Sequence, residues 1–274
     1  MSKTMPAITK TIAALESNLG QFAAVAVAVS GGIDSLTLAT LAGRRHAKRA
    51  EMFHAVSAAV PPEATLRVRQ RAIADGWRLK VINAGEFDQP KYIANPVNRC
   101  FFCKQSLYTT IAAATNAQIL SGTNLDDLAD YRPGLDAARD AGVRHPFAEL
   151  GIGKTTIREI ARQIGLGALA ELPASPCLAS RVETGTRISA ELLRWIHAVE
   201  NVVRERVAAN AIRCRMRGDA VVIEIDPEVL DTMSDAHQRE IAEAVSALGP
   251  LHGIVPRPSF APYRRGSAFL LAHD

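Results

Sequence analysis

The stretch at 23–35, which reads AAVAVAVSGGIDS, constrains the fold more than any other part of the chain. Its run of small and β-branched apolar residues is typical of a buried parallel strand, and Ser30-Gly31-Gly32 then allows a sharp turn. We expect a helix to begin directly after this turn. A strand, a glycine turn and a helix start bring several backbone N–H groups to the positive end of a helix dipole, where proteins bind phosphate.

Three side chains of this stretch fit a phosphate site. Ser30 and Ser35 would add hydroxyl donors, whereas Asp34 would repel phosphate unless a cation such as Mg²⁺ lay between them. The stretch therefore predicts a site for a metal–nucleotide complex. It has neither the Gly-Lys-Ser/Thr of a Walker A loop nor the GxGxxG of a dinucleotide turn, and an ordinary glycine-containing turn is the alternative.

The pattern after this stretch alternates between helices and strands. Helical spacing covers 36–49 and 62–75, and short apolar runs at 52–58, 78–83 and 118–122 are typical of strands. Such an alternation predicts an α/β fold with a doubly wound parallel sheet. In such a sheet, ligands bind beyond the carboxyl ends of the strands.

Polar residues follow two of these predicted strands. Ser57 would lie beside the adenine of a nucleotide, or it is an ordinary polar residue at a strand end. Thr123 and Asp127 would contribute to Mg²⁺ or ribose binding, although the same stretch equally fits a helix N-cap with an acidic first turn. We therefore expect these side chains at the same edge of the sheet as the glycine turn.

Three of the four cysteines lie in segments that position a side chain. Cys100 and Cys103, in NPVNRCFFCK, occupy the first turn of a predicted helix that ends near residue 114, and their spacing places both thiols on one face. A helix N-terminus favours the thiolate, which binds metals and attacks sulfur, although two core cysteines are the alternative. Cys177 lies in the proline-stiffened loop PASPCLASR, which indicates a side chain held in place.

From about residue 187 the pattern changes to that of a second, smaller α+β unit. We expect a long helix that ends near residue 209, two short strands at 213–216 and 220–225, and a helix near 236–248.

Arginines gather in this second unit. Arg213 and Arg215 alternate with apolar residues in the first strand, so both side chains lie on one strand face. Paired guanidinium groups indicate recognition of phosphate or carboxylate, and the alternative is a solvated basic face. Arg264 would add another anion contact near the C-terminal end.

Composition limits the class of protein. The chain has 274 residues, of which 48% are hydrophobic, enough for one large or two modest domains, here predicted at 1–185 and 186–274. The sequence shows neither a signal peptide nor a long apolar run, so we expect a cytoplasmic protein. Four cysteines without an export signal favour metal or redox chemistry over disulfides. A net charge of +4 fits small anionic ligands as well as RNA.

Several blocks of the sequence, taken together, resemble a known family. They are SGGIDS, NPVNRCFFCK, GTNLDDLADYRPG, GVRHPFAELGIGKTTIREIARQIGL, PASPCLASR, IRCRMRGDAVVIEI and YRRGS. SGGIDS alone resembles the PP-loop of the ATP pyrophosphatases, which cut ATP between its α- and β-phosphates. The whole set, in order along most of the chain, resembles the LarE family, the ATP-dependent sulfur transferases of nickel-pincer cofactor biosynthesis.

The resemblance implies a PP-loop fold of the HUP-like type with a smaller C-terminal domain, and a reaction that uses ATP and Mg²⁺. A carboxylate of pyridinium-3,5-dicarboxylate mononucleotide would be adenylated with loss of pyrophosphate, and sulfur would then displace AMP to give a thiocarboxylate. Asp34 and Cys177 would be catalytic. The residues implied for the nucleotide are Ser30, Gly31, Gly32, Asp34, Ser35, Ser57, Thr123 and Asp127. Those implied for the substrate are Arg181, Arg213, Arg215 and Arg264.

The resemblance also implies a role for the cysteines. Cys177 matches the family's sulfur-handling cysteine, which in the sacrificial version gives up its own sulfur and becomes dehydroalanine. Cys100 and Cys103 are a departure from that version and resemble the members that bind a [4Fe–4S] cluster through three cysteines. We therefore expect Cys100, Cys103 and Cys177 to hold such a cluster, with an open iron for an extra sulfide. The spacing alone fits Zn²⁺ with a fourth, non-cysteine ligand as well.

Two other functions fit parts of the pattern. A tRNA-thiolating PP-loop enzyme also combines SGGxDS with cysteines, but it would need a larger basic surface than a net charge of +4 indicates. A regulatory nucleotide-binding module would have no use for three positioned cysteines. We expect a homo-oligomer whose partners are the small-molecule substrate and sulfide or another sulfur donor, with neither nucleic acid nor membrane.

Overall fold

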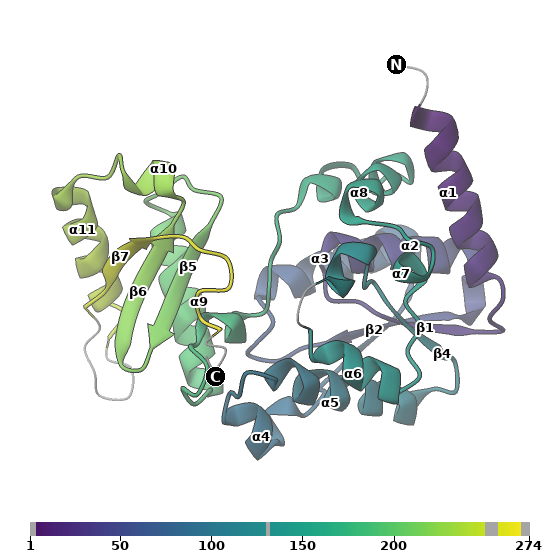
Figure 1. Cartoon of the computed structure of the whole chain (residues 1–274), viewed down its shortest axis with the longest axis horizontal. Helices are drawn as coiled ribbons and strands as arrows, with labels where there is room; N and C mark the ends of the chain where they lie inside the picture. The colour runs from purple at the N-terminus through teal and green to yellow at the C-terminus, as the bar shows by residue number, and fades with distance from the viewer. Residues whose placement is uncertain (1–3, 130–131, 250–256, 270–274) are drawn as a thin grey trace. The chain divides into compact units, whose positions relative to one another are not determined.

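The computed structural model describes residues 4–129, 132–249 and 257–269 (Figure 1). The chain divides into two compact units. Unit 1 comprises Met1–Glu86 and Cys100–Ser175, and unit 2 comprises Phe87–Arg99 and Pro176–Asp274. Among the helices of the described residues, none combines the length and the apolar character that a membrane crossing requires.

Unit 1 is built on a parallel sheet of four strands in the order β3-β2-β1-β4. The strands are β1 (Val25–Ala28), β2 (Ala50–Ala55), β3 (Arg78–Ile82) and β4 (Gln118–Ser121). The direction of strand order reverses at β1, because β2 and β3 lie on one side of it and β4 on the other. Ligands of open parallel sheets bind at such a reversal, beyond the carboxyl ends of the strands. Here that place is the carboxyl end of β1 and β4.

Helices cover both faces of this sheet (Figure 1). One core holds residues of α1 (Thr4–Leu19), α2 (Ile33–His46), α3 (Pro62–Asp75) and α8 (Lys154–Gln163). The opposite core holds residues of α5 (Arg99–Ala114) and α6 (Gly134–Asp140). Along β1, Val25 and Val27 belong to the first core and Ala26 to the second. A strand that is buried on both sides reads as a continuous apolar run, and this explains the opening stretch of the sequence.

The predicted order of elements in unit 1 is confirmed. The strand, the glycine turn and the helix follow one another at β1 and α2, and the helix predicted at 62–75 is α3. Gly76 ends α3 in the left-handed conformation, with φ of 65°. The remaining short elements are η1 (Ala47–Arg49), η2 (Glu86–Asp88), η3 (Leu125–Leu128), α7 (Pro146–Glu149) and η4 (Gly167–Glu171).

Unit 2 is a mixed three-stranded sheet with helices packed on it. β5 (Ile212–Arg217) and β6 (Ala220–Ile225) are antiparallel, and β7 (Ser259–Pro262) runs parallel to β6. α9 (Ala190–Arg204) packs on β5, and α11 (Asp235–Ser246) packs on α9. The short helices are α4 (Pro90–Ile93), η5 (Leu178–Arg181) and α10 (Pro227–Leu230). The hairpin and both long helices match the sequence-based expectation, whereas β7 was not predicted.

The compact units are not contiguous in sequence, and the functional domains predicted at 1–185 and 186–274 stay a prediction. Phe87–Arg99 and the segment from Pro176 onward both belong to unit 2. The side chain of Asn95, fully buried, donates to the carbonyls of Glu183 (2.8 Å) and Thr186 (2.9 Å). The carbonyl of Asn95 in turn accepts from the Gly185 amide (2.8 Å). These bonds join segments about ninety residues apart, so local sequence patterns do not reveal them.

Candidate functional site

The loop after β1 closes through the hydroxyl of Ser35. This hydroxyl accepts a hydrogen bond from the Ser30 amide (3.1 Å) and donates to the Gly32 carbonyl (3.0 Å). Gly31 has φ of 86°, and a Cβ at this position would lie 2.7 Å from the Ala64 carbonyl oxygen. The loop therefore requires glycine at position 31. Gly32 is the N-cap of α2 and has no side chain to cover the first-turn N–H groups, so an anion is favoured there.

β2 and α3 support this loop from one side. His54 of β2, which is buried, contacts the Val29 carbonyl through Nδ1 (2.7 Å) and the Thr65 hydroxyl of α3 through Nε2 (2.9 Å). Burial lowers the pKa of His54, so the ring is neutral at pH 7. Arg67 of α3 donates from Nε to the Gly31 carbonyl (3.2 Å). Side chains of β2 and α3 thus fix the start of the loop through the carbonyls of Val29 and Gly31.

The end of β4 lies against the other side of the loop. A Cβ at Gly122 would lie 2.8 Å from the Ser35 nitrogen and 2.9 Å from the Asp34 carbonyl carbon, so the two backbones pass in direct contact. Asn124, fully buried, donates from Nδ2 to Asp34 Oδ2 (3.4 Å). This contact shows that the loop and the end of β4 meet at the strand-order reversal, as the topology predicts.

Asp34 is the central acid of this site. Its Oδ2 lies 3.6 Å from Nζ of Lys154, the first residue of α8. Its Oδ1 is buried and has no hydrogen-bond partner among the described residues. Burial raises the pKa of Asp34, the nearby charge of Lys154 opposes this shift, and the charge of Asp127 adds to it. An orphaned carboxylate oxygen with a second carboxylate nearby fits Mg²⁺, which in nucleotide sites takes one or two carboxylates together with phosphate oxygens.

Lys154 is a site residue that sequence reasoning did not single out. It follows the turn Gly151-Ile152-Gly153, and its backbone N–H donates to Asp126 Oδ2 (2.6 Å). A lysine directly after a glycine turn at a helix start was the available signal. Its meaning depended on the order of the strands and helices, which brings it to Asp34.

Thr123 and Asp127 lie at the predicted edge, where both already have partners. The Asp127 side chain accepts from the Asn124 amide (3.2 Å) in a capping box at η3 and pairs with Arg132 (2.7 Å). The Thr123 hydroxyl contacts that of Ser121 (3.0 Å). The capping alternative is therefore present in the structure, and the roles of both residues in Mg²⁺ or ribose binding stay predictions.

Ser57 lies just beyond β2, and its hydroxyl accepts from the Ala59 amide (3.2 Å). This short-range bond is typical of a polar residue at a strand end. Contact of Ser57 with adenine stays a prediction.

Among the described residues, none of the four cysteines forms a disulfide. Cys100 and Cys103 lie half-buried in the first turn of α5, as predicted, and belong to unit 1. Cys177 is exposed and belongs to unit 2, and Cys214 is buried in β5. Within the residues that the structure describes, no three His, Cys, Asp or Glu side chains gather as a metal site. The three-cysteine ligand set stays a prediction.

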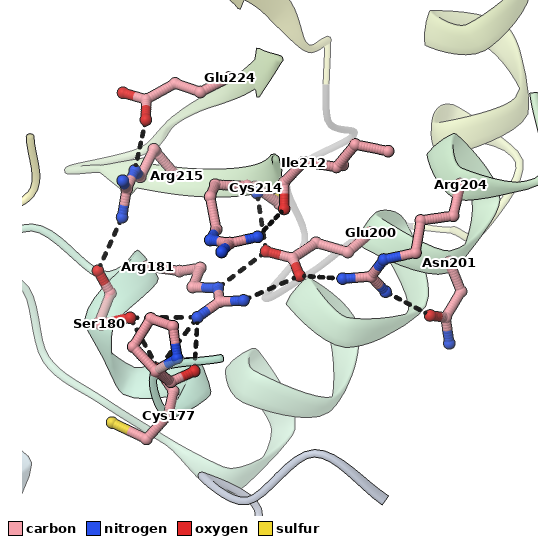
Figure 2. Close-up of polar contacts among 12 residues, drawn as sticks. Cys177, Ser180, Arg181, Glu200, Asn201, Arg204, Ile212, Cys214, Arg215 and Glu224 are labelled. Atoms are coloured by element: carbon pink, nitrogen blue, oxygen red, sulfur yellow. Dashed lines mark hydrogen bonds and ion pairs between the residues drawn. The ribbon is translucent and has the colours of Figure 1, made fainter. Parts of the chain in front are cut away.

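Arg181, predicted to bind substrate, points into unit 2. Its side chain is 3% exposed, and its Nε and Nη2 donate to the carboxylate of Glu200 (2.8 and 3.1 Å). Its Nη1 donates to the carbonyl of Pro176 (2.8 Å) and that of Cys177 (3.3 Å). Figure 2 shows the guanidinium between Glu200 and this turn, with Sγ of Cys177 pointing away from it. All three guanidinium nitrogens of Arg181 thus bond to protein acceptors.

The carboxylate of Glu200, in α9, accepts hydrogen bonds from four nitrogen atoms. Besides Arg181, it accepts from Arg204 Nη2 (2.7 Å) and from the Cys214 amide (3.1 Å) (Figure 2). Burial alone would raise the pKa of Glu200, but the hydrogen bonds and the charges of the two arginines outweigh it and lower that pKa. Glu200 is therefore ionised and paired.

Arg215 is also inside unit 2 rather than on an exposed face. Its Nε donates to Glu224 Oε2 (2.8 Å) and its Nη1 to the Ser180 carbonyl (2.9 Å), with both charged side chains at 5% exposure or less. Arg213 is half-buried, with its guanidinium 5.6 Å from the centre of the Tyr263 ring. Arg264 is exposed. The pair does not form a solvated basic face, and substrate binding by these arginines stays a prediction.

Comparison with known proteins adds sequence relatives. No protein-family model matches the chain. The chain is 34% identical over 243 residues to the uncharacterized protein slr1717 of Synechocystis sp., a match that covers 87% of this chain and 90% of that protein. It is 29% identical over 227 residues to the uncharacterized protein MJ0830 of Methanocaldococcus jannaschii, a match that covers 78% of this chain and 82% of that protein.

A third relative has a named activity. The chain is 30% identical over 135 residues to the pyridinium-3,5-bisthiocarboxylic acid mononucleotide synthase of Lactiplantibacillus plantarum. This match spans 48% of each protein. The match to the Synechocystis protein covers nearly all of both chains, so the chain belongs to one family with it, and the partial match to the synthase supports LarE as that family.

Proposed function

We propose that the protein is an ATP-dependent sulfur transferase that converts a carboxylate of pyridinium-3,5-dicarboxylate mononucleotide into a thiocarboxylate. The observation that carries this proposal is the Ser30–Ser35 loop at the strand-order reversal. There, Oδ1 of Asp34 has no hydrogen-bond partner among the described residues, and Oδ2 lies 3.6 Å from Nζ of Lys154. The substrate is suggested by the relative that is named as a synthase of the bisthiocarboxylic acid mononucleotide.

The first step would make the carboxylate reactive. An oxygen of the substrate carboxylate attacks the α-phosphorus of ATP, the bond from this phosphorus to the bridging oxygen breaks, and pyrophosphate leaves. Asp34 would hold Mg²⁺, and Lys154 with the first-turn N–H groups of α2 would bind the departing phosphates. The acyl adenylate that results carries AMP as a good leaving group, which the carboxylate lacked.

The second step would transfer sulfur. A hydrosulfide sulfur attacks the acyl carbon, the bond from this carbon to the AMP oxygen breaks, and a thiocarboxylate, AMP and one proton are released without oxidation or reduction. The thiols of Cys100, Cys103 and Cys177 are the donor type that iron–sulfur clusters use. A [4Fe–4S] cluster held by three cysteines would supply an open iron for the sulfide that is delivered.

The test is an anaerobic assay with ATP, Mg²⁺, the pyridinium dicarboxylate mononucleotide and sulfide. We expect pyrophosphate and thiocarboxylate over many turnovers, with Cys177 unchanged in mass. Cys100→Ala and Cys103→Ala should each lose bound iron and multiple turnovers together. Cys214→Ala is the matched control, because Cys214 is 1% exposed and lies in the core of unit 2; it should keep both.

Two results would change the proposal. Wild-type protein that releases no pyrophosphate with this substrate would overturn it. Protein lighter by one H₂S at Cys177 after a single turnover, in variants that lack Cys100 or Cys103, would show the sacrificial reaction instead.

A further inference from the structure

The turn that carries Cys177 is held through its carbonyl groups. The Cys177 carbonyl accepts from the Ser180 amide (3.0 Å), from the Ser180 hydroxyl (2.7 Å) and from Arg181 Nη1 (3.3 Å). The preceding carbonyl, of Pro176, accepts from the same guanidinium nitrogen (2.8 Å). The backbone on both sides of the Cys177 side chain is thus fixed, while the side chain itself is exposed.

The guanidinium that makes these bonds is anchored by a buried carboxylate. Glu200 is fully buried and binds Nε and Nη2 of Arg181 in the two-pronged geometry that arginine favours. This leaves the remaining nitrogen, Nη1, aimed at the turn, as Figure 2 shows. A lysine has one nitrogen and cannot bind the carboxylate and both carbonyls in this way.

We propose that Arg181 and Glu200 are positioning residues that fix the backbone of Cys177 and thereby hold its thiol in place for the sulfur-transfer step. The inference deepens the proposed function and rests on it for the sulfur-transfer step. Because a displacement of about 1 Å in a reacting group can cost on the order of 100-fold in rate, a fixed backbone at Cys177 would serve transfer to the acyl adenylate. Adenylation, which does not use Cys177, would not depend on this pair.

The test compares three measurements in the full-length variant Arg181→Lys. They are amide hydrogen exchange in the turn at 178–182, pyrophosphate release and thiocarboxylate formation. We expect exchange at Ser180 to rise at least ~10-fold and thiocarboxylate formation to fall at least ~10-fold, with pyrophosphate release within ~2-fold of wild type. Glu200→Gln keeps an acceptor for Arg181 and should show a smaller change of the same kind.

Arg206→Lys is the matched control in the same unit. Arg206 donates to the Val202 carbonyl (2.8 Å) and pairs with Glu205 (3.6 Å), and neither partner lies in the turn. It should leave all three measurements unchanged. If Arg181→Lys does not fold, the double variant Arg181→Met with Glu200→Gln takes its place. It removes the hydrogen bonds from Arg181 to the turn without leaving an unpaired buried charge.

Unchanged exchange at 178–182 in a folded variant would overturn the inference, as would equal losses of pyrophosphate release and sulfur transfer. The exchange measurement needs no substrate. If the wild-type protein releases no pyrophosphate, the proposed function fails, while faster exchange in Arg181→Lys still shows that Arg181 fixes the turn.

Discussion

Replacing Arg215 by methionine tests whether this arginine is part of the fold of unit 2 or a substrate ligand. The change removes a guanidinium whose side chain is 5% exposed and leaves Glu224, at 1%, without its closest cation. Loss of one partner of a buried ion pair costs about 3–5 kcal/mol. Arg217 (3.1 Å) and the Ser267 hydroxyl (2.7 Å) still contact Glu224, so we expect the lower end, about 3 kcal/mol.

Urea unfolding followed by far-ultraviolet circular dichroism measures this loss. Arg215→Met combined with Glu224→Gln should recover most of the stability, because no unpaired buried charge is left. Arg217→Ala should cost less than about 1 kcal/mol, since the Arg217 side chain is 40% exposed. A loss under about 1 kcal/mol in Arg215→Met, together with a substrate constant raised ~10-fold, would refute the structural role and support substrate binding.

Three further predictions concern unit 1. Asp34→Asn should abolish pyrophosphate release yet raise the melting temperature without nucleotide, because burial raises the pKa of Asp34 and its ionised form therefore destabilises the fold; a lower melting temperature would contradict this. Lys154→Met should slow pyrophosphate release on the order of 100-fold with little change in stability, and a wild-type rate would remove Lys154 from the site. Burial lowers the pKa of His54, so the unfolded chain takes up a proton near pH 6.5 before the folded one does, and stability should fall as pH drops below about 6.5. The free energy of unfolding, measured with urea at pH 7.5 and 5.5, should differ less between the two pH values in His54→Gln than in wild type. An equal difference would exclude His54 as a source of the pH dependence.

Much of the α/β architecture is predictable because it depends on local patterns. The apolar run of β1, the glycine after α3 and the alternation in β5 and β6 each specify an element from neighbouring residues alone. The boundary between the units is different. Phe87–Arg99 belongs to unit 2, where the side chain of Asn95 binds carbonyls of a segment about ninety residues further along the chain.

The candidate site shows the same contrast. Asp34 and the two serines were recognisable within six residues of sequence, whereas Lys154 joins them only through the order of strands and helices. Arg213 and Arg215 of β5 were recognised as a pair, but Glu224, the carboxylate that pairs with Arg215, was not. A signal was present in the neighbouring strand, because Glu224 lies directly opposite Arg213 in the hairpin, and opposite charges at such positions attract.

The buried arginines also bear on the tRNA-thiolating alternative. Binding of RNA requires lysines and arginines that reach phosphates from the surface, and each such contact steepens the fall of affinity with salt. Arg181 and Arg215 are at most 5% exposed and are paired with Glu200 and Glu224, so their charge is neutralised inside unit 2. Arg181 and Arg215 therefore do not contribute to a basic surface for nucleic acid. We expect labelled tRNA to bind weakly at 0.15 M salt. Tight binding whose affinity falls steeply with salt would instead favour the tRNA-thiolating enzyme, because it would require a basic surface elsewhere on the chain.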